Sequence, residues 1–460
     1  MSFWTSIKNA VANKWPREYS HDILPPQEMR QAMTLPWVRA TMVKFSRDES
    51  KRNPYYASVL NKLAEQVLGP CPTIIAIGET AQDNDLIEDS YVDWTQQNLI
   101  GRALRLLRRE AALTGIGFLL PVKVETFHPI QVGFKAYGWD SLAQPPNKGI
   151  HDRCIDGIQY NKDWEPEYFY FENDTDKPDR RSAKDVIWWS RGYEKGILEP
   201  VPECLAAFTF YPFVRRYLQA VIEGEEFRTS FPMALELDPT VYKANEMKLQ
   251  KLEKFQYQPR SVPSLPVGTT LRGMPSGSNP GQIDKTLRAF AGACALTIDM
   301  PANLALGDSS NSNMATAQID SQPWKNRVNV DRFDLNPALR KTFNYWYMGA
   351  RNVRGLTPES SRPGNLYEDY YPHIHVYDPL FNHPDPQKNA NARATDLASG
   401  VGTLNEIYSQ LGMNPRRQLE REAKLMEMTY QEYVKMIMLN RSNLALNVLG
   451  TNNEETQTEA

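Results

Sequence analysis

Apolar residues recur at helical spacing in the first part of this chain. Between residues 53 and 67 the apolar positions lie three or four apart, which predicts a helix that ends at Gly69-Pro70. A second, longer helix is expected from Ile87 to Ala112, with a cap from the acidic stretch 83–85 and an end at Gly115. Each pattern leaves one polar side, so each helix should pack against a core.

Shorter segments rich in β-branched and aromatic residues predict strands. The expected strands cover residues 73–77, 118–124, 130–134 and 185–190, and an expected hairpin covers residues 157–171. Residues 1–50 show no sustained period and predict an irregular N-terminal arm. The first 190 residues therefore predict a mixed α+β unit.

Two amphipathic helices then bracket a stretch of different composition. The helices are expected at Pro212–Phe231 and Gln282–Ile298, and the residues between them are rich in Lys, Gln, Pro, Ser and Gly. Such an excursion predicts a small module of strand, helix and loop that is appended to the main body.

A long helix is expected after the second of these helices. The small polar residues Asp308–Asn313 can cap a helix that runs from Met314 to about Gly349. Pro323 and Pro337 should kink or interrupt this helix, because proline lacks the backbone donor. Further strand and helix signals are present at residues 374–378 and 404–428, and the last ten residues are polar and acidic.

Composition narrows the class of protein. The chain has 460 residues, with 52 Lys and Arg against 55 Asp and Glu, so it is not a polybasic nucleic-acid coat. A hydrophobic content of 41% argues against wholesale disorder, and a mean hydropathy of −0.54 argues against an integral membrane protein. The four cysteines are scattered without a CxxC pair, which predicts reduced thiols rather than a disulfide framework.

The sequence offers little for catalysis. It contains no GxxxxGK[ST] loop, no HExxH and no GxSxG elbow, so we expect no enzyme, no catalytic residue and no cofactor. One metal-like cluster is formed by His373, His375, Asp378, His383 and Asp385. A solvent-facing strand and loop explains this cluster better than a bound metal, and a metal-dependent hydrolase remains an alternative.

Several short motifs follow one another in an order that resembles the portal proteins of tailed bacteriophages, closest to the lambda-type branch. The matching segments are Arg52–Pro70, Ile87–Trp94, Asp156–Tyr160 with Pro166–Tyr170, Ala183–Trp188, Asp308–Ala317 and Gly402–Arg417. Trp188 stands where the family usually has His, and Gln318 stands where many members have Arg. Each motif is degenerate alone, and their order carries the resemblance.

The resemblance implies an α+β portal fold, with a mixed α/β wing, a two-helix stem, a small α/β clip and a helical crown, assembled as a ring around a central channel. The boundaries that follow are an arm at 1–50, a first wing part at 50–210, stem helices at 211–231 and 281–298, a clip at 232–280, a tunnel loop at 299–313, a long kinked helix with the second wing part at 314–403, and a crown with a polar tail at 404–460.

The resemblance also implies a function. Portal proteins form a ring, twelve-fold in the virion, at one vertex of the phage head, and double-stranded DNA passes through it during packaging and ejection. The expected partners are further copies of the chain, DNA without sequence preference, the terminase large subunit, a head–tail adaptor or connector protein, the major capsid protein and any scaffolding protein. The expected location is the virion, with assembly in the host cytoplasm. Another virion head or adaptor protein is the alternative.

Three sets of residues would serve such a function. The tunnel loop would present Asn303, Asp308, Ser309, Ser310, Asn311, Ser312 and Asn313 to the channel, where small polar groups let a duplex slide. The stem would place opposite charges on neighbouring copies through Arg215, Arg216, Glu223, Glu225, Glu226, Arg228, Lys285 and Arg288. The clip would offer a docking surface with Lys243, Lys248, Lys251, Lys254 and Arg260.

A basic run in the second predicted helix allows two interpretations. Arg102, Arg105 and Arg109 share one helical face, and Arg108 lies beside them. Salt bridges between subunits of a ring are favoured over a DNA-facing patch.

Overall fold

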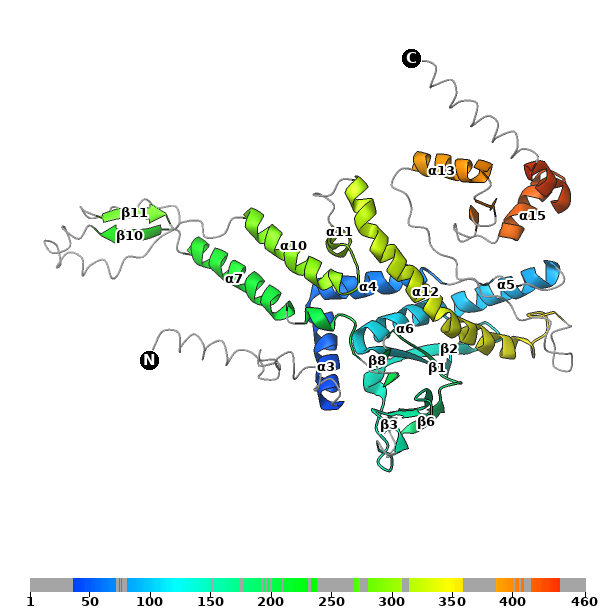
Figure 1. Ribbon diagram of the computed structural model, residues 1–460, viewed down its shortest axis with the longest axis horizontal. Coiled ribbons are helices and arrows are strands. Elements are labelled where there is room, and N and C mark those ends of the chain that lie inside the picture. The colour runs from blue at the N-terminus through cyan, green and yellow to red at the C-terminus, as the bar shows by residue number, and fades with distance from the viewer. Residues whose placement is uncertain are drawn as a thin grey trace, which may run out of the picture.

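The computed structural model describes residues 36–438 with gaps (Figure 1). The residues outside the description are 1–35, 72–73, 75, 77–80, 150–151, 174–176, 192, 195–196, 199–200, 209, 231–232, 238–268, 274–279, 308–313, 359–385, 400–401, 405–406, 409–414 and 439–460. The predicted strand at 374–378, the polar tail, and most of the predicted clip lie outside the described residues.

The chain begins its described part with two helices, α3 (Pro36–Arg52) and α4 (Pro54–Leu68). The predicted α4 is confirmed, and the Asn53 side chain caps it by accepting hydrogen bonds from the backbone of Tyr55 and Tyr56. The predicted irregular arm is wrong for the described residues 36–50. The inward face of α3 includes the charged residues Arg39 and Glu49, which hid its period in the sequence.

The single long helix predicted over residues 87–112 is two helices, α5 (Ala81–Gln97) and α6 (Ile100–Thr114). They are separated at Asn98 and Leu99, where the Leu99 backbone adopts a φ of 54°. The acidic stretch 83–85 lies inside α5 and does not precede it. The predicted end at Gly115 is confirmed, with a φ of 90° that favours glycine.

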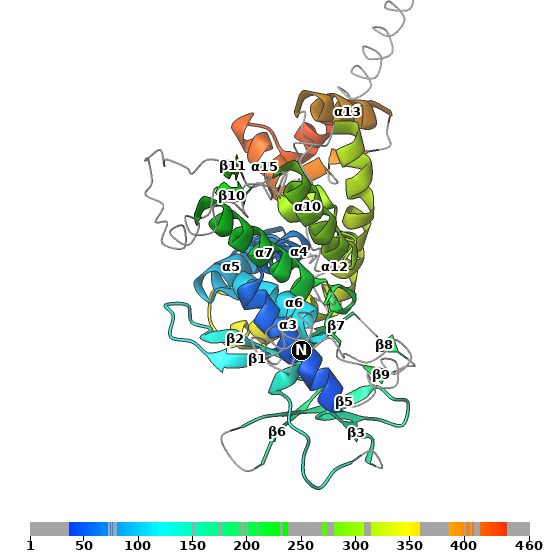
Figure 2. The ribbon, with the colours of Figure 1, turned by 90° about the vertical axis from the view of Figure 1, so that its left-hand side faces the viewer.

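A three-stranded antiparallel sheet lies against α6 (Figure 2). Its strands are β1 (Ile116–Lys123), β2 (Val132–Gly138) and β7 (Ile187–Ser190), in the order β2-β1-β7. Close packing of helix and sheet requires Gly117, because a Cβ there would overlap the carbonyl oxygen of Leu107. The predicted strands near 118–124, 130–134 and 185–190 are confirmed, with shifted ends. Ile74 and Ala76 are buried as expected but lie outside any strand.

A second antiparallel sheet packs against the other face of the first. It contains β3 (Cys154–Ile155), β4 (Ile158–Tyr160), β5 (Pro166–Phe171) and β6 (Asp179–Ser182), and β4 and β5 form the predicted hairpin. Phe118 of the first sheet meets Phe169 and Phe171 of the second with ring centroids 4.9 and 5.3 Å apart. Two short elements, η2 (Trp139–Ser141) and the strand pair β8 (Tyr193–Glu194) and β9 (Ile197–Leu198), border these sheets.

Beyond the sheets, η4 (Leu205–Ala207) leads into α7 (Tyr211–Ser230), and α10 (Pro280–Leu296) returns to the body. Both predicted amphipathic helices are confirmed. The described part of the intervening module is a pair of antiparallel strands, β10 (Met233–Leu237) and β11 (Thr269–Gly273). A short helix, α11 (Ala302–Leu306), follows α10, so Asn303 lies in a helix and the loop predicted there is wrong at this position.

The long helix α12 (Met314–Ala350) crosses the body, as predicted (Figure 1). It contains Pro323 and Pro337 and runs through both without interruption. The carbonyls that these prolines leave without a donor belong to Ile319 and Phe333, which are both exposed, so water can satisfy them. The prolines therefore do not interrupt the helix, and a kink at either of them stays a prediction.

The last described helices are α13 (Pro386–Ser399), α15 (Pro415–Leu425) and a helix at residues 430–438. The helix α15 confirms the second helix of the pair predicted within residues 404–428, and the predicted turn at 412–414 lies outside the described residues. The helix at 430–438 was not predicted, and its Tyr433 packs with Leu419 and Ala423 in a small core of their own. None of the helices in the described part of the chain combines the length and apolar character needed to span a bilayer.

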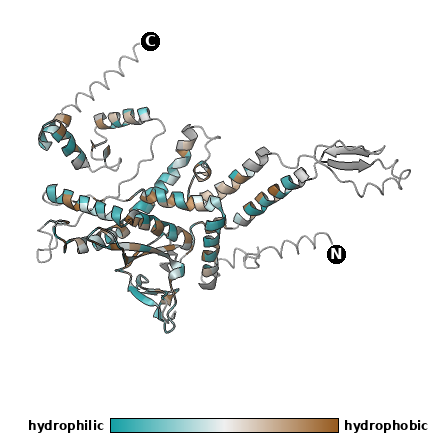
Figure 3. Ribbon diagram, turned by 180° about the vertical axis from the view of Figure 1, so that it is seen from behind, coloured by the Kyte–Doolittle hydropathy of each residue, from teal (hydrophilic) through white to brown (hydrophobic). Residues whose placement is uncertain are grey.

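The main core lies between the sheet and the helices around it. Trp94, Trp324 and Trp346 are fully buried there and come from α5 and α12. Figure 3 shows apolar and polar residues alternating along the helices, as expected where one face of each helix is buried. The described architecture is thus a mixed α+β body with a helical projection.

Candidate functional site: a projecting arm and the buried joint at its base

One part of the molecule leaves the body, and we call it the arm: α7, β10, β11 and α10. Figures 1 and 2 show α7 and α10 running alongside each other toward the strand pair at the far end. With 20 and 17 residues, the helices are about 30 and 26 Å long at the usual rise per residue. The strands pair in register, with Leu235 opposite Leu271. Two helices separated by 49 residues of chain thus form one projection.

Aromatic packing anchors the base of α7 in the body. The buried Tyr211 lies 5.1 Å from the ring of Tyr56 in α4 and 5.9 Å from that of Phe208. Further along α7, Phe213 and Ile222 are exposed. The helix is therefore fixed at one end and presents apolar side chains to the surroundings along its length.

An ion pair adds to this anchor. Arg215 pairs with Glu49, whose side chain is almost fully buried in α3. Arg215 was predicted to pair between subunits, and the structure places it in a pair within the chain. On the same helix, Glu223 accepts a hydrogen bond from Gln219 at 2.7 Å.

The remaining predicted stem charges lie on the two arm helices. Arg216 and Arg288 are half-buried, while Glu223, Glu225, Glu226 and Lys285 are exposed, and Arg228 belongs to the last turns of α7. A role for these charges between copies of the chain stays a prediction.

The base of α10 is buried as well, and it meets the base of α7. Cys294 of α10 interacts with Tyr211 of α7, and Cys204, just before η4, interacts with Thr297. Burial raises the pKa of Cys204 and that of Cys294 to about 12. Both groups are therefore neutral thiols that act as small apolar residues at the place where the two arm helices join the body.

These two thiols should be unreactive in the folded chain. At about pH 8 iodoacetamide should alkylate Cys204 and Cys294 only after denaturant is added, because the thiolate is the nucleophile and both thiols are buried. The half-buried Cys71 is the internal control and should react first. Mass spectrometry of the alkylated peptides measures this order. Fast labelling of Cys204 or Cys294 without denaturant would show that the arm base is open in solution.

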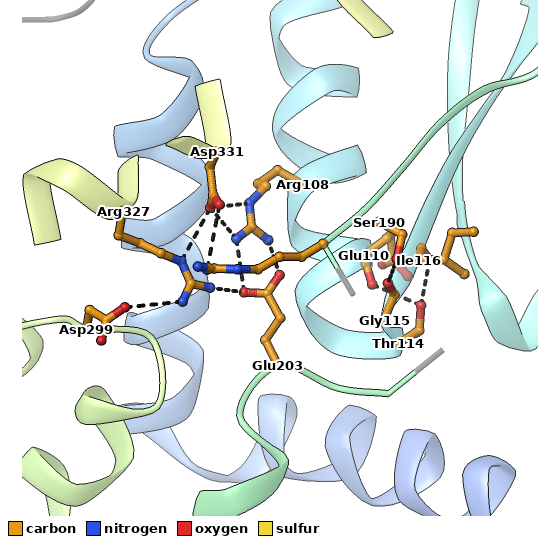
Figure 4. A network of polar contacts seen from close by, with 11 residues as sticks. Arg108, Glu110, Thr114, Gly115, Ile116, Ser190, Glu203, Asp299, Arg327 and Asp331 are labelled. Carbon is orange, nitrogen blue, oxygen red and sulfur yellow. Dashed lines mark hydrogen bonds and ion pairs between the residues drawn. The ribbon is translucent and has the colours of Figure 1, made fainter. Parts of the chain in front are cut away.

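A network of charged side chains, which we call the joint, lies inside the body next to the arm base (Figure 4). Arg108 of α6 donates hydrogen bonds to Glu203 at 2.7 Å and to Asp331 of α12 at 2.6 Å. Arg327 of α12 donates to the other oxygen of Glu203 at 2.5 Å. Both Arg108 and Asp331 are fully buried.

Two further contacts connect the joint to its surroundings. Arg327 lies 3.6 Å from Asp299, which follows α10, and Arg191 lies 3.6 Å from Asp331. Burial lowers the pKa of Arg108, but the carboxylates of Glu203 and Asp331 outweigh this effect and raise it overall. The joint therefore ties α6 and α12 to both segments that lead into the arm, and it fixes the position of the arm base.

The basic run of α6 serves the chain itself in this structure. Arg108 is in the joint, Arg105 donates to the carbonyls of Gly69 and Pro70, and Arg109 donates to Asn61 at 3.1 Å. A DNA-facing or inter-subunit role for Arg108 is therefore wrong. The sequence pattern placed this arginine on the surface of a helix, whereas in the fold it is fully buried and pairs with Asp331 of α12. Arg102 is exposed.

Sequence reasoning missed the carboxylates of the joint. Glu203 lies 95 residues from Arg108, and Asp331 lies 223 residues from it, so no local pattern connects them. The one available signal was the spacing of four between Arg327 and Asp331 on a predicted helix.

The segment between α10 and α12 begins against α4. Lys62 donates hydrogen bonds to the carbonyls of Leu304 and Ala305, at 2.5 and 3.2 Å, near the C-terminal end of α11. The remaining tunnel-loop candidates, Asp308–Asn313, lie outside the described residues, as do Lys243, Lys248, Lys251, Lys254 and Arg260 of the predicted clip.

The described residues hold no group of three or more His, Cys, Asp or Glu side chains arranged for a metal. The histidine cluster around His373 lies outside them. The candidate site is thus an arm with a charged joint and is built from packing and ion pairs.

No protein-family profile and no curated protein matches the chain. Among solved structures, it is similar to a chain in the virion of a native gene transfer agent particle, with 14% identity, a TM-score of 0.44, and coverage of 81% of this chain and 93% of that one. A chain of the neck of the native particle, computed with C12 symmetry, matches with 14% identity, a TM-score of 0.42 and coverage of 81% and 93%.

A third similar structure is a HK97 family phage portal protein from Corynebacterium diphtheriae. It shares 12% identity, has a TM-score of 0.29, and the match covers 65% of this chain and 90% of that one. All three TM-scores lie below 0.5, so these matches report what the chain is similar to and carry no inference about its function.

Proposed function

We propose that this chain is a non-enzymatic, portal-type subunit that assembles with copies of itself into a ring, and that double-stranded DNA passes through the central channel of that ring. In this proposal α7 and α10 form the stem, the module between them forms the clip, and the helices after residue 404 form the crown. The ring occupies one vertex of a phage-type head.

The arm is the observation that carries the proposal. Two helices that bracket a separate module leave an α+β body side by side, and the order of sequence motifs around them resembles that of the portal family. Phe213 and Ile222 are exposed on the projecting arm, and exposed apolar side chains on such a projection favour association with another protein. Neighbouring arms in a ring would cover these side chains.

The outer face of α12 supports assembly independently of the arm. Ile319, Val330, Phe333 and Met348 are all exposed, and their spacing puts them on one side of the helix. The exposed Asn326 and Arg340 lie between them on the same side, so this side of α12 is a mixed surface with several exposed apolar side chains, which favours a contact with another protein. The opposite side of α12 carries Trp324 and Trp346 into the core.

The channel contacts are assigned to the residues between α10 and α12. Asp308–Asn313 are small and polar, so they would touch a duplex without the strong, salt-dependent grip of a row of arginines. Asn303 lies at the start of this segment, in α11. The stem charges and the clip cations would act between copies and toward docking proteins.

The proposed partners follow from the same arrangement. The chain has no P-loop, so the ATP-driven motor is a terminase large subunit that docks on the ring. A head–tail adaptor or connector protein would replace it after packaging, and the major capsid protein, with any scaffolding protein, would surround the ring. The protein would therefore reside in the virion after assembly in the host cytoplasm.

Electron microscopy of the purified full-length chain tests the proposal. We expect rings with a central hole wide enough for duplex DNA, with α7 and α10 of each copy next to the axis and residues 308–313 facing the hole. A chain that stays monomeric at every concentration and salt condition would contradict the proposal. An assembly without a central hole would favour another head or adaptor protein.

A further inference from the structure

Two large apolar side chains stand out at one corner of the body, and we call them the knob: Leu99 and Phe127. Leu99 lies between α5 and α6 and is 60% exposed, and Phe127 lies in the loop between β1 and β2 and is fully exposed. The residues beside them, Asn98 and Thr126, are joined by a hydrogen bond of 2.8 Å, which holds the two side chains on the same corner.

The knob is built on a fixed base. The buried Asn98 donates hydrogen bonds to the carbonyls of Ile130 and Val132, both at 2.8 Å. The buried His128 accepts a hydrogen bond from the backbone of Ile130 at 3.0 Å. These contacts pin the loop on both sides of Phe127, so its exposure is a set feature of the fold.

The backbone at the knob is also strained. Leu99 has a φ of 54°, a left-handed conformation that is rare for a bulky side chain. A glycine or asparagine would relieve the strain, and an exposed leucine gains nothing from burial in the single chain. Strain of this kind tends to mark functional positions, and here it presents an apolar side chain outward.

A hollow of about 540 Å³ lies elsewhere on the same body. Its apolar wall includes Trp164, Pro166, Ala183 and Trp188. A cavity of about 150 Å³ accepts a benzene ring, so this hollow has room for a phenyl ring together with a leucine side chain. Aromatic walls are typical of the pockets that receive anchor residues at protein interfaces.

The topology keeps the knob and the hollow of one copy apart. The knob lies at the loop that joins β1 to β2, and β2 is one edge of the three-stranded sheet. The hollow is lined by Trp188 of β7, which is the opposite edge. Figure 2 shows β2 and β7 on opposite sides of the view. Only a second copy can bring the knob of one chain to the hollow of another.

Charged residues of both signs surround the knob and the hollow. Arg102 and Lys123 are exposed near the knob, and Asp163 and Glu165 are exposed at the lip of the hollow. The knob region also carries the exposed Glu125, and the lip carries the exposed Lys184. Lys341 also lines the hollow. The two cations near the knob outnumber its one carboxylate, so they can face Asp163 and Glu165 across a contact of knob and hollow.

We propose that the knob of one copy of this chain occupies the hollow of the next copy, and that this head-to-tail contact repeats around the ring. The inference rests on the proposed function for its closed ring. A contact between two different patches, here the knob and the hollow, is called heterologous. Repeated heterologous contacts close into a ring when the rotation from each copy to the next adds up to a full turn.

Charge reversal in the full-length chain tests the pairing. Arg102→Glu and Asp163→Lys should each raise the protein concentration for half-assembly at least tenfold, because each puts like charges together. A chain with both Arg102→Glu and Asp163→Lys should assemble nearly as well as the wild type, because opposite charges face each other again across the contact. Phe127→Ser should weaken assembly by a similar factor without changing the melting temperature of the monomer, because its side chain touches solvent only. Lys51→Glu, exposed at the end of α3, is the matched control, because it belongs neither to the knob nor to the lip of the hollow.

Directional crosslinking gives the second readout. With Cys71→Ser in both chains, a chain with Phe127→Cys mixed with a chain with Glu165→Cys should form a mixed disulfide dimer under mild oxidation, and neither chain alone should do so. Self-linking of the Phe127→Cys chain would overturn the proposal in favour of a two-fold contact. If the Phe127→Ser chain forms rings as well as the wild type and no mixed dimer appears, the contact of knob and hollow is overturned and the proposed ring is retained. A wild-type chain that forms no oligomer would overturn the ring and the contact together.

Discussion

Replacing Asp331 by Asn should destabilise the folded chain by about 3–5 kcal/mol. Asp331 is fully buried and accepts two hydrogen bonds from Arg108, at 3.2 and 2.6 Å. The amide keeps the shape of the side chain and removes the charge, so Arg108 is left with one carboxylate, Glu203, which Arg327 also uses. A buried cation with too little negative charge around it is costly. The midpoint of denaturant unfolding measures the loss.

Asp179→Asn is the matched control for this substitution. Asp179 pairs with Arg181 at 2.8 Å, but both side chains are exposed, so its loss should cost about 0–1 kcal/mol. Arg108→Met together with Asp331→Leu should cost less than the two single changes added, because the pair is removed as a unit. An Asp331→Asn chain as stable as the Asp179→Asn chain would show that the joint does not hold the body together.

The sequence pattern was informative wherever local periodicity decided the structure. The helix α4, the hairpin of β4 and β5, and both arm helices were predicted because their buried positions are apolar and regularly spaced. In each case the residues that shape the element lie within a few turns of one another.

The failures have a common cause in long-range contacts. The break between α5 and α6 depends on Asn98, whose amide bonds to carbonyls 32 and 34 residues away. The helix α3 was missed because its inward Arg39 and Glu49 are matched by Asp156 and Arg215, far along the chain. Polar residues at buried positions look like surface residues until their partners are known.

The candidate site divides in the same way. The arm could be predicted because two amphipathic helices bracket a polar module, whereas the joint could not, since its four main residues come from three separate regions of the sequence. The knob was also beyond sequence reasoning. A leucine and a phenylalanine are assigned to a core by default, and their exposure depends on a helix break and a loop that only the fold reveals.

Replacing Trp346 by Ala should cost about 3–5 kcal/mol of stability. Trp346 is fully buried on the inner side of α12, and its ring lies 5.4 Å from those of Tyr91 and Phe343. The loss combines the lost transfer of the indole from water to the core with the cost of the cavity that remains, because the surrounding core relaxes only partly into such a cavity. The same unfolding midpoint measures it.

Two further variants separate packing from other effects at Trp346. Its indole nitrogen has no hydrogen-bond partner in the described part of the chain, so Trp346→Phe loses no hydrogen bond and should retain most of the stability. Phe333→Ala, on the outer side of the same helix and 76% exposed, should change the monomer by no more than about 0.5 kcal/mol. If α12 instead turned its Phe333 side inward, the order would reverse, and Phe333→Ala would be the damaging change. The two substitutions therefore determine which side of α12 remains available to neighbouring copies in the proposed ring.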